Sequence, residues 1–181
     1  MRDDSLVARH NKQGFRGRWL EDRIEDTNRM YAHRNIAIIN KIPTPTQVIR
    51  SNGKIVGARY EKKSTVDFTG ILDDGGRFIA FDTKECQKTS FSFSSVLSHQ
   101  VQFLKKIKDL NGEAFILIYF RTMNELYKID IDEYLDLMNK MSRKSIPYLY
   151  FKETKQPIVM HKYGYFFDYL GAGRKNMEVI Q

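Results

Sequence analysis

Three charged residues interrupt an otherwise apolar stretch between residues 64 and 86, which reads STVDFTGILDDGGRFIAFDTKEC. Asp67 lies in the segment TVDFTGIL, and Asp82 and Lys84 lie in RFIAFDTKE. Both segments are typical of β-strands, and the Asp-Asp-Gly-Gly run at 73–76 supplies a turn between them. Charged side chains are rarely buried in strands unless they are paired or bind a metal ion. The two acids and the lysine are therefore the first candidates for chemistry.

The chemistry follows from the way side chains alternate along a strand. Asp82 and Lys84 share one face, and Asp67 on the neighbouring strand can lie close to Asp82. Two nearby carboxylates repel each other unless a proton or a cation lies between them. Oxygen ligands favour hard cations such as Mg²⁺ or Mn²⁺, and the backbone carbonyl of Thr83 can face the same cation. With Lys84 to orient water or to stabilise a phosphoryl group, these parts suit metal-assisted hydrolysis of a phosphodiester. The alternative is a plain Asp82–Lys84 salt bridge at a strand end.

Composition narrows the class of protein. The chain has 181 residues, enough for one domain with a core, and its formal net charge is +8 with a pI near 9.5. A basic protein of this kind is expected to bind nucleic acid. We expect no membrane-spanning segment and no secretory signal. The single cysteine, Cys86, excludes an internal disulfide and favours a cytoplasmic location.

The elements that must position these residues are predicted from periodicity and turn signals. Residues 1–15 lack periodicity and are expected to form a flexible basic arm. Helical spacing predicts helices over 18–34, 94–110 and 131–141, and apolar runs predict strands over 35–42, 65–72, 77–85, 113–120 and 126–130. Residues 43–63 read as a long basic hairpin that turns at Asn52-Gly53. Residues 142–181 show no clear helical or strand periodicity. This order predicts an α/β protein with a mixed sheet flanked by helices.

At this point the chain resembles a known family. VDFTGIL followed by FIAFDTKEC is similar to the PD-(D/E)xK nuclease motif, and the wider chain resembles RecU-type Holliday-junction resolvases. The resemblance extends to FRGRWLEDRIEDTNRMY, to IAIINKIPTPTQVI with its Pro-Thr-Pro, and to KTSFSFSSVLSHQVQFLKKI. RKSIPYL and GYFFDYL are similar to the C-terminal part of the family. The resemblance covers roughly residues 15–170.

The resemblance implies a restriction-endonuclease-like mixed sheet flanked by helices, with a protruding basic stalk hairpin. It implies a homodimer that binds four-way junction DNA and nicks two opposed strands, using Mg²⁺ or Mn²⁺, in recombination and repair. Asp67 and Asp82 would be metal ligands and Lys84 the catalytic lysine, with Thr65 a weaker candidate. Glu21, which borders the apolar face of the first helix, would add a metal or water contact. The domain would cover 16–181, with the stalk inserted at about 43–64.

Eight residues are candidates for contacts with DNA. Seven are basic residues of the N-terminal arm and the stalk, and Gln100 resembles a family position near the active site. They are Arg16, Arg18, Arg50, Lys54, Arg59, Lys62, Lys63 and Gln100.

The sequence departs from the family in two places and leaves two other functions open. Asp82 stands where the family usually has Glu, and the stalk is shorter than in relatives. The alternatives are a PD-(D/E)xK endonuclease that acts on ordinary duplex or branched DNA, and a non-catalytic DNA-binding module with a degenerate site. A stalk argues against the first alternative, and the intact set of Asp67, Asp82 and Lys84 argues against the second.

Overall fold

The computed structural model describes residues 4–43, 46–60, 65–162 and 164–172, with side chains from residue 18 onward apart from 46–48 and 58–60. Its centre is a five-stranded sheet in the order β1-β4-β5-β7-β8. These strands are β1 (Ala37–Lys41), β4 (Phe68–Leu72), β5 (Phe78–Cys86), β7 (Glu113–Phe120) and β8 (Glu125–Asp130). β5 and β7 are parallel and the other pairs are antiparallel, so the predicted mixed sheet is confirmed.

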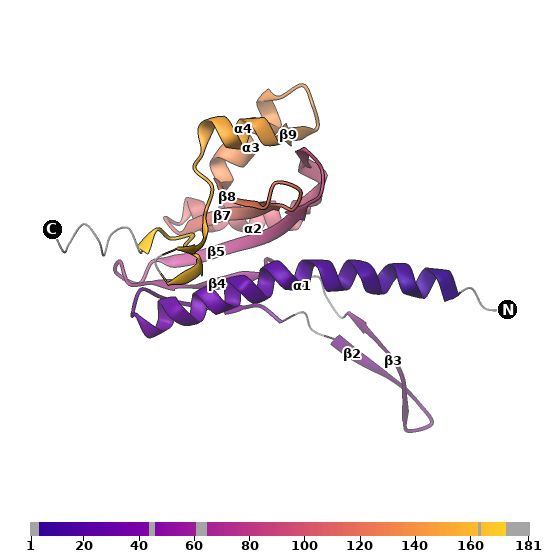
Figure 1. The fold of residues 1–181 in the computed structure, drawn as a ribbon. Helices are drawn as coiled ribbons and strands as arrows, with labels where there is room; N and C mark the ends of the chain where they lie inside the picture. The colour runs from indigo at the N-terminus through magenta and orange to yellow at the C-terminus, as the bar shows by residue number, and fades with distance from the viewer. Residues whose placement is uncertain (1–3, 44–45, 61–64, 163, 173–181) are drawn as a thin grey trace.

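Helices cover both faces of this sheet, as Figure 1 shows. One core packs α1 (Asp4–His33) against the sheet through Leu20, Ile24 and Tyr31. The opposite core joins α2 (Ser98–Asp109), α3 (Ile131–Lys140) and α4 (Tyr148–Thr154) to the alternate side chains of β5 and β7. β7 is almost entirely buried because it is an interior strand with a core on each side. The prediction for EAFILIYF is therefore confirmed.

Some element boundaries differ from the predictions. β4 begins at Phe68 and not at residue 65, because its pairing with β1 and β5 starts there, so Asp67 lies just before the strand and not within it. α1 begins at Asp4, well before residue 18, because its polar N-terminal half has no apolar stripe that periodicity could detect. The flexibility of residues 1–15 stays a prediction. α2 begins at Ser98 and not at residue 94, since a short 3₁₀ turn, Phe93–Ser95, precedes it.

The hairpin is formed by β2 (Thr46–Ser51) and β3 (Lys54–Tyr60), which pair only with each other among the described strands. Asn52 and Gly53 both have positive φ, of 50° and 77°, as a tight hairpin turn requires. The turn at Asn-Gly is therefore confirmed. In Figure 1 the hairpin projects away from the five-stranded sheet, on the side of α1.

The structure also contains four short strands that the sequence did not predict. β6 (Ser90–Ser92) pairs with β9 (Ser145–Pro147), and β10 (Met160–Lys162) pairs with β11 (Tyr165–Phe167). Each of these strands is three residues long and carries too little pattern of its own, and β6 and β9 also lie far apart in the sequence. Among the described residues, no helix is long and apolar enough to cross a membrane.

Candidate active site

The site lies where β4 ends and β5 continues. The β4–β5 pairing stops at the pair Phe68 and Phe81, while β5 remains paired with β7 as far as Cys86. Beyond Phe81, the Asp67 side chain takes the place that a β4 backbone group would hold. Asp67 Oδ2 accepts hydrogen bonds from the Thr83 N–H at 2.8 Å and from the Thr83 hydroxyl at 2.9 Å. The strand end therefore fixes the first acid.

Asp82 is fully buried on the face of β5 that α2 covers. Gln100 donates from Nε2 to Asp82 Oδ1 at 2.6 Å, while Gln100 Oε1 accepts the Leu97 N–H at 3.0 Å. Lys84, two residues along the same face, places its ammonium against Asp82 Oδ2 as an ion pair. Oδ2 has no aligned hydrogen-bond donor among the described residues. One oxygen of Asp82 is thus held by an amide, and the other contacts the Lys84 ammonium.

The Asp67 carboxyl group lies close enough to Asp82 for its charge to act on the pKa of that group. Burial raises the pKa of Asp82 most, the Lys84 charge lowers it and the Asp67 charge raises it, and the resulting pKa is about 7. An acid with this pKa is easily protonated near neutral pH, and it loses the proton to solvent when a cation binds the carboxylate. The structure therefore brings Asp67, Asp82 and Lys84 together at this strand end, as the sequence predicted.

The residues present fit a divalent cation with two acidic ligands. Asp67 and Asp82 offer carboxylate oxygens, and Asp82 Oδ2 is a buried acceptor without an aligned donor. The Thr83 carbonyl points to the same edge of β5 as its N–H, which meets Asp67. An all-oxygen set of this kind suits Mg²⁺ or Mn²⁺, with water and phosphate completing the shell. Within the described part of the chain, no three His, Cys, Asp or Glu side chains gather tightly enough to hold a metal ion.

Glu21 lies on α1, close enough to the site for the charges of Asp67 and Lys84 to act on it. Burial raises its pKa, Lys41 and Lys84 lower it, and Asp67 raises it. Its carboxylate contacts Lys41 Nζ at 2.8 Å and does not join Asp67 and Asp82 in a cluster. The helix thus brings a third acid to the edge of the site.

Comparison with known proteins identifies the family. The sequence model of the family described as RecU, Recombination protein U, matches residues 15–175. This chain belongs to the RecU family. A Holliday junction resolvase RecU of Oceanobacillus iheyensis is 37% identical over 179 residues, covering 92% of this chain and 90% of the relative. A Holliday junction resolvase RecU of Bacillus cereus is 35% identical over 156 residues, covering 81% of this chain and 74% of the relative.

A solved structure also aligns with this RecU family chain. It is Hjc, a Holliday junction resolvase of Archaeoglobus fulgidus, with a TM-score of 0.38 and 10% identity. The alignment covers 68% of this chain and 84% of Hjc.

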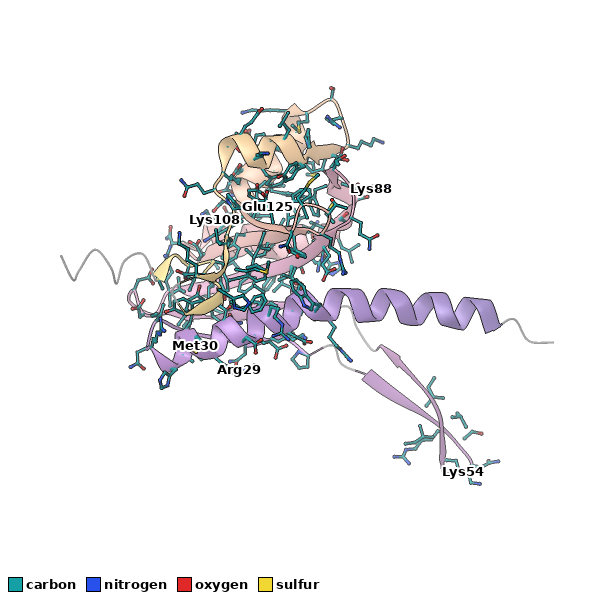
Figure 2. All side chains as sticks on the ribbon, viewed as in Figure 1. Arg29, Met30, Lys54, Lys88, Lys108 and Glu125 are labelled. Carbon is teal, nitrogen blue, oxygen red and sulfur yellow. The ribbon has the colours of Figure 1, made fainter. Side chains whose placement is uncertain are left out.

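The residues predicted to contact DNA in this RecU family member differ in exposure, and the structure does not describe all of them. Arg18 is exposed on α1, and Arg50 and Lys54 are exposed on the hairpin, where Figure 2 shows Lys54 at the far end. Gln100 is buried and bonded to Asp82, so the structure gives it an orienting contact, and its contact with DNA stays a prediction. Lys62 and Lys63 lie outside the described residues, as do the side chains of Arg16 and Arg59.

Sequence reasoning missed one function of Thr83. It predicted a carbonyl ligand, but the N–H and hydroxyl of Thr83 are also the groups that hold Asp67. The hydroxyl of Thr83, between Asp82 and Lys84 in the strand, is the signal that could have indicated it. Thr65, the weaker candidate, is exposed two residues before Asp67.

Proposed function

We propose that this chain is a metal-dependent endonuclease that resolves four-way DNA junctions by paired, symmetric nicks. One observation carries the proposal: buried Asp82 faces Asp67 and the Lys84 ammonium at a strand end that is open on the β4 side. Membership of the RecU family and relatives named Holliday junction resolvase support the substrate. The sheet with helices on both faces agrees with a restriction-endonuclease-like fold.

The residues have separate tasks in this mechanism. Asp67, Asp82 and the Thr83 carbonyl would hold Mg²⁺ or Mn²⁺, which would supply positive charge at the scissile phosphate and favour deprotonation of the attacking water. Lys84 orients the attacking water or stabilises negative charge on the phosphate oxygens. Gln100 keeps the Asp82 carboxylate oriented, and the Thr83 N–H and hydroxyl do the same for Asp67.

Two opposed strands of a junction require two sites in a fixed relation. A four-way junction can have twofold symmetry, and a twofold homodimer matches it with two copies of the Asp67–Asp82 site. We therefore propose a homodimer as the working form. Light scattering at micromolar protein tests this: a dimer is expected, and a fully active monomer would contradict it.

The β2–β3 hairpin is the proposed discriminator between junction and plain duplex. It projects from the sheet in Figure 1 and carries exposed Arg50 and Lys54. Such a basic hairpin can enter the open centre of a junction, which a continuous duplex lacks. Replacing 46–62 with a short Gly-Ser turn should remove the preference for junction over duplex at fixed salt. A preserved ratio would assign specificity to the N-terminal arm.

The proposal is tested by cleavage of a mobile four-way junction and of matched linear duplex. Mg²⁺ should support nicking of the junction, and a chelator should abolish it. Faster cleavage of the linear duplex would favour an ordinary duplex endonuclease. Binding of the junction without cleavage in Mg²⁺ or Mn²⁺ would favour a non-catalytic DNA-binding module.

A further inference from the structure

Lys41 lies between two glutamates of α1 at the last position of β1. Its Nζ contacts Glu21 Oε2 at 2.8 Å and Glu25 Oε1 at 3.0 Å. Glu21 and Glu25 are four residues apart on one helix, so their side chains project to the same side and repel each other without a cation between them. Lys41 therefore holds both carboxylates.

The position of Lys41 connects the hairpin to the active site. The chain leaves the sheet after Lys41 toward β2, and it returns from β3 at Asp67. The Ile42 N–H donates to the Asp67 carbonyl at 2.8 Å and closes the base of this excursion. The outgoing strand thus carries the lysine that holds Glu21, and the residue just before the returning strand is the first acid of the site.

Glu21 is near the site but is engaged elsewhere. The charges of Asp67 and Lys84 reach its carboxyl group, yet its Oε2 bonds to Lys41 and it does not complete a three-carboxylate cluster among the described residues. The ion pair with Lys41 accounts for this arrangement, because a carboxylate bound to an ammonium is not free to turn toward a metal ion.

We propose that Lys41 is a positioning residue with two alternative partners: Glu21 and Glu25 in the free protein, and a backbone phosphate when DNA reaches the hairpin base. When the phosphate takes the Lys41 ammonium, Glu21 is released toward Asp67 and the bound cation. DNA at the hairpin base then completes the acidic site. This inference rests on the proposed function and adds a residue to it.

The exchange of partners is physically easy. The side chains of Lys41, Glu21 and Glu25 are 33%, 28% and 35% exposed, so water and salt screen their ion pairs. Such pairs are weak, whereas lysine–phosphate contacts gain from the release of counterions around DNA. A phosphate at the hairpin base can therefore compete with the two carboxylates.

The first test measures Mn²⁺ binding by calorimetry without DNA. Lys41→Met should bind Mn²⁺ more tightly than wild type, by about 5-fold or more, because it frees the Glu21 carboxylate for the cation. The double variant Lys41→Met/Glu21→Gln should bind no more tightly than Glu21→Gln alone. Lys41→Arg should behave as wild type. Unchanged or weaker binding in Lys41→Met would overturn the inference, and so would a gain that persists without Glu21.

The second test measures junction binding in a chelator, where nothing is cleaved. Lys41→Met should lower the slope of log affinity against log salt concentration by about 1, as the loss of one phosphate contact does. An unchanged slope would overturn the assignment of a phosphate partner. Thermal melting monitors folding, and Lys41→Gln replaces Lys41→Met in both tests if the methionine variant unfolds.

Lys105 provides a matched control. It also contacts two carboxylates, Asp109 at 2.5 Å and Asp132 at 3.0 Å, and its side chain is 41% exposed. Lys105→Met should change neither Mn²⁺ affinity nor the salt slope. Equal effects at Lys105 and Lys41 would show that any lost lysine charge has this effect, and would overturn the specific role of Lys41. Wild type that binds neither Mn²⁺ nor the junction would instead contradict the proposed function. Normal wild-type binding with an unaffected Lys41→Met contradicts the role of Lys41 alone.

Discussion

Two regions with buried polar groups differ in how those groups are paired. One is the C-terminal seam, which we define as Tyr31 of α1 with Asp168, Leu170 and Ala172. There Asp168 Oδ1 accepts the Tyr31 hydroxyl at 2.8 Å and the Ala172 N–H at 3.0 Å. The Tyr31 oxygen in turn accepts the Leu170 N–H at 3.1 Å. Neutral donors meet a carboxylate, and the C-terminal segment is fixed to the helix.

In the candidate active site, by contrast, two acidic side chains lie close together. Asp82 is fully buried beside Asp67, and burial raises its pKa to about 7 although Lys84 lies against it. A satisfied buried network adds to stability, whereas a group held in an unfavourable charge state subtracts from it. The difference indicates that the seam serves the fold and that the site is arranged for a ligand that is positively charged.

The largest expected effect breaks the chemistry and leaves the seam intact. Lys84→Met should lower the single-turnover nicking rate by roughly 10²–10⁴-fold, because it removes the group that orients water or neutralises phosphate charge. Junction affinity should hardly change, since many other Lys and Arg contacts supply it. Gel assays of nicking and binding measure both. Undiminished nicking would remove Lys84 from the mechanism, and Lys140→Met, on the exposed face of α3, is the control.

The next effect breaks the seam and leaves the chemistry intact. Tyr31→Phe should lower the free energy of unfolding by about 1–3 kcal/mol, because Asp168 and the Leu170 N–H each lose a buried partner. Urea denaturation measures the change. The nicking rate of the folded variant should equal that of wild type. A stability change below that of Tyr150→Phe, a half-buried tyrosine paired with Glu133, would show that the seam is not a stabilising network.

A smaller effect has the opposite sign and comes from the active site. Asp82→Asn should raise the free energy of unfolding by about 1–2 kcal/mol at pH 8 without divalent metal, since it removes a buried charge. The folded pKa of Asp82 is raised to about 7 from an ordinary 3.8, so between these values only the folded state binds the proton. Wild-type stability from this group therefore falls as pH rises from about 4 to 7.

The pH dependence of this gain is the check. The advantage of Asp82→Asn should shrink as pH falls from 8 toward 5, where the folded wild type is protonated. Urea titrations at the two pH values measure it. Equal stability differences at both values, or a loss at pH 8, would show that Asp82 carries no penalty of burial.

The smallest effect concerns the hairpin. Replacing both Arg50 and Lys54 with Ala should lower the salt slope of junction binding by about 2, as two lost phosphate contacts would. The nicking rate of bound junction should stay the same, because neither side chain is near Asp82. Filter binding across a salt series measures the slope. A slope equal to that of wild type would place DNA away from the hairpin.

The sequence predicted the strands that position the site because their apolar runs and turn residues are local signals. Alternation along β5 was enough to place Lys84 beside Asp82, and the hairpin turn placed Asp67 opposite them. Asn52-Gly53 was equally explicit, since few dipeptides adopt two positive φ angles.

The features that the sequence did not predict depend on contacts between distant segments. The family resemblance placed Gln100 near the active site, but its hydrogen bond to Asp82, 18 residues away, was not predicted. The Tyr31–Asp168 bond joins residues 137 apart. The position of Lys41 between Glu21 and Glu25 requires knowing how α1 crosses β1. No sequence period or motif indicates such contacts, so they become apparent only in the folded structure.

The central claim is that the Asp67–Asp82 site cuts two opposed strands of a junction. The most direct measurement maps the nicks on a four-way junction, with each strand end-labelled in turn, for wild type and Asp82→Asn in Mg²⁺. The account predicts one nick at symmetric positions on each of two opposed strands for wild type and none for Asp82→Asn. Nicks that persist in Asp82→Asn, or that fall without symmetry on any strand, would contradict it.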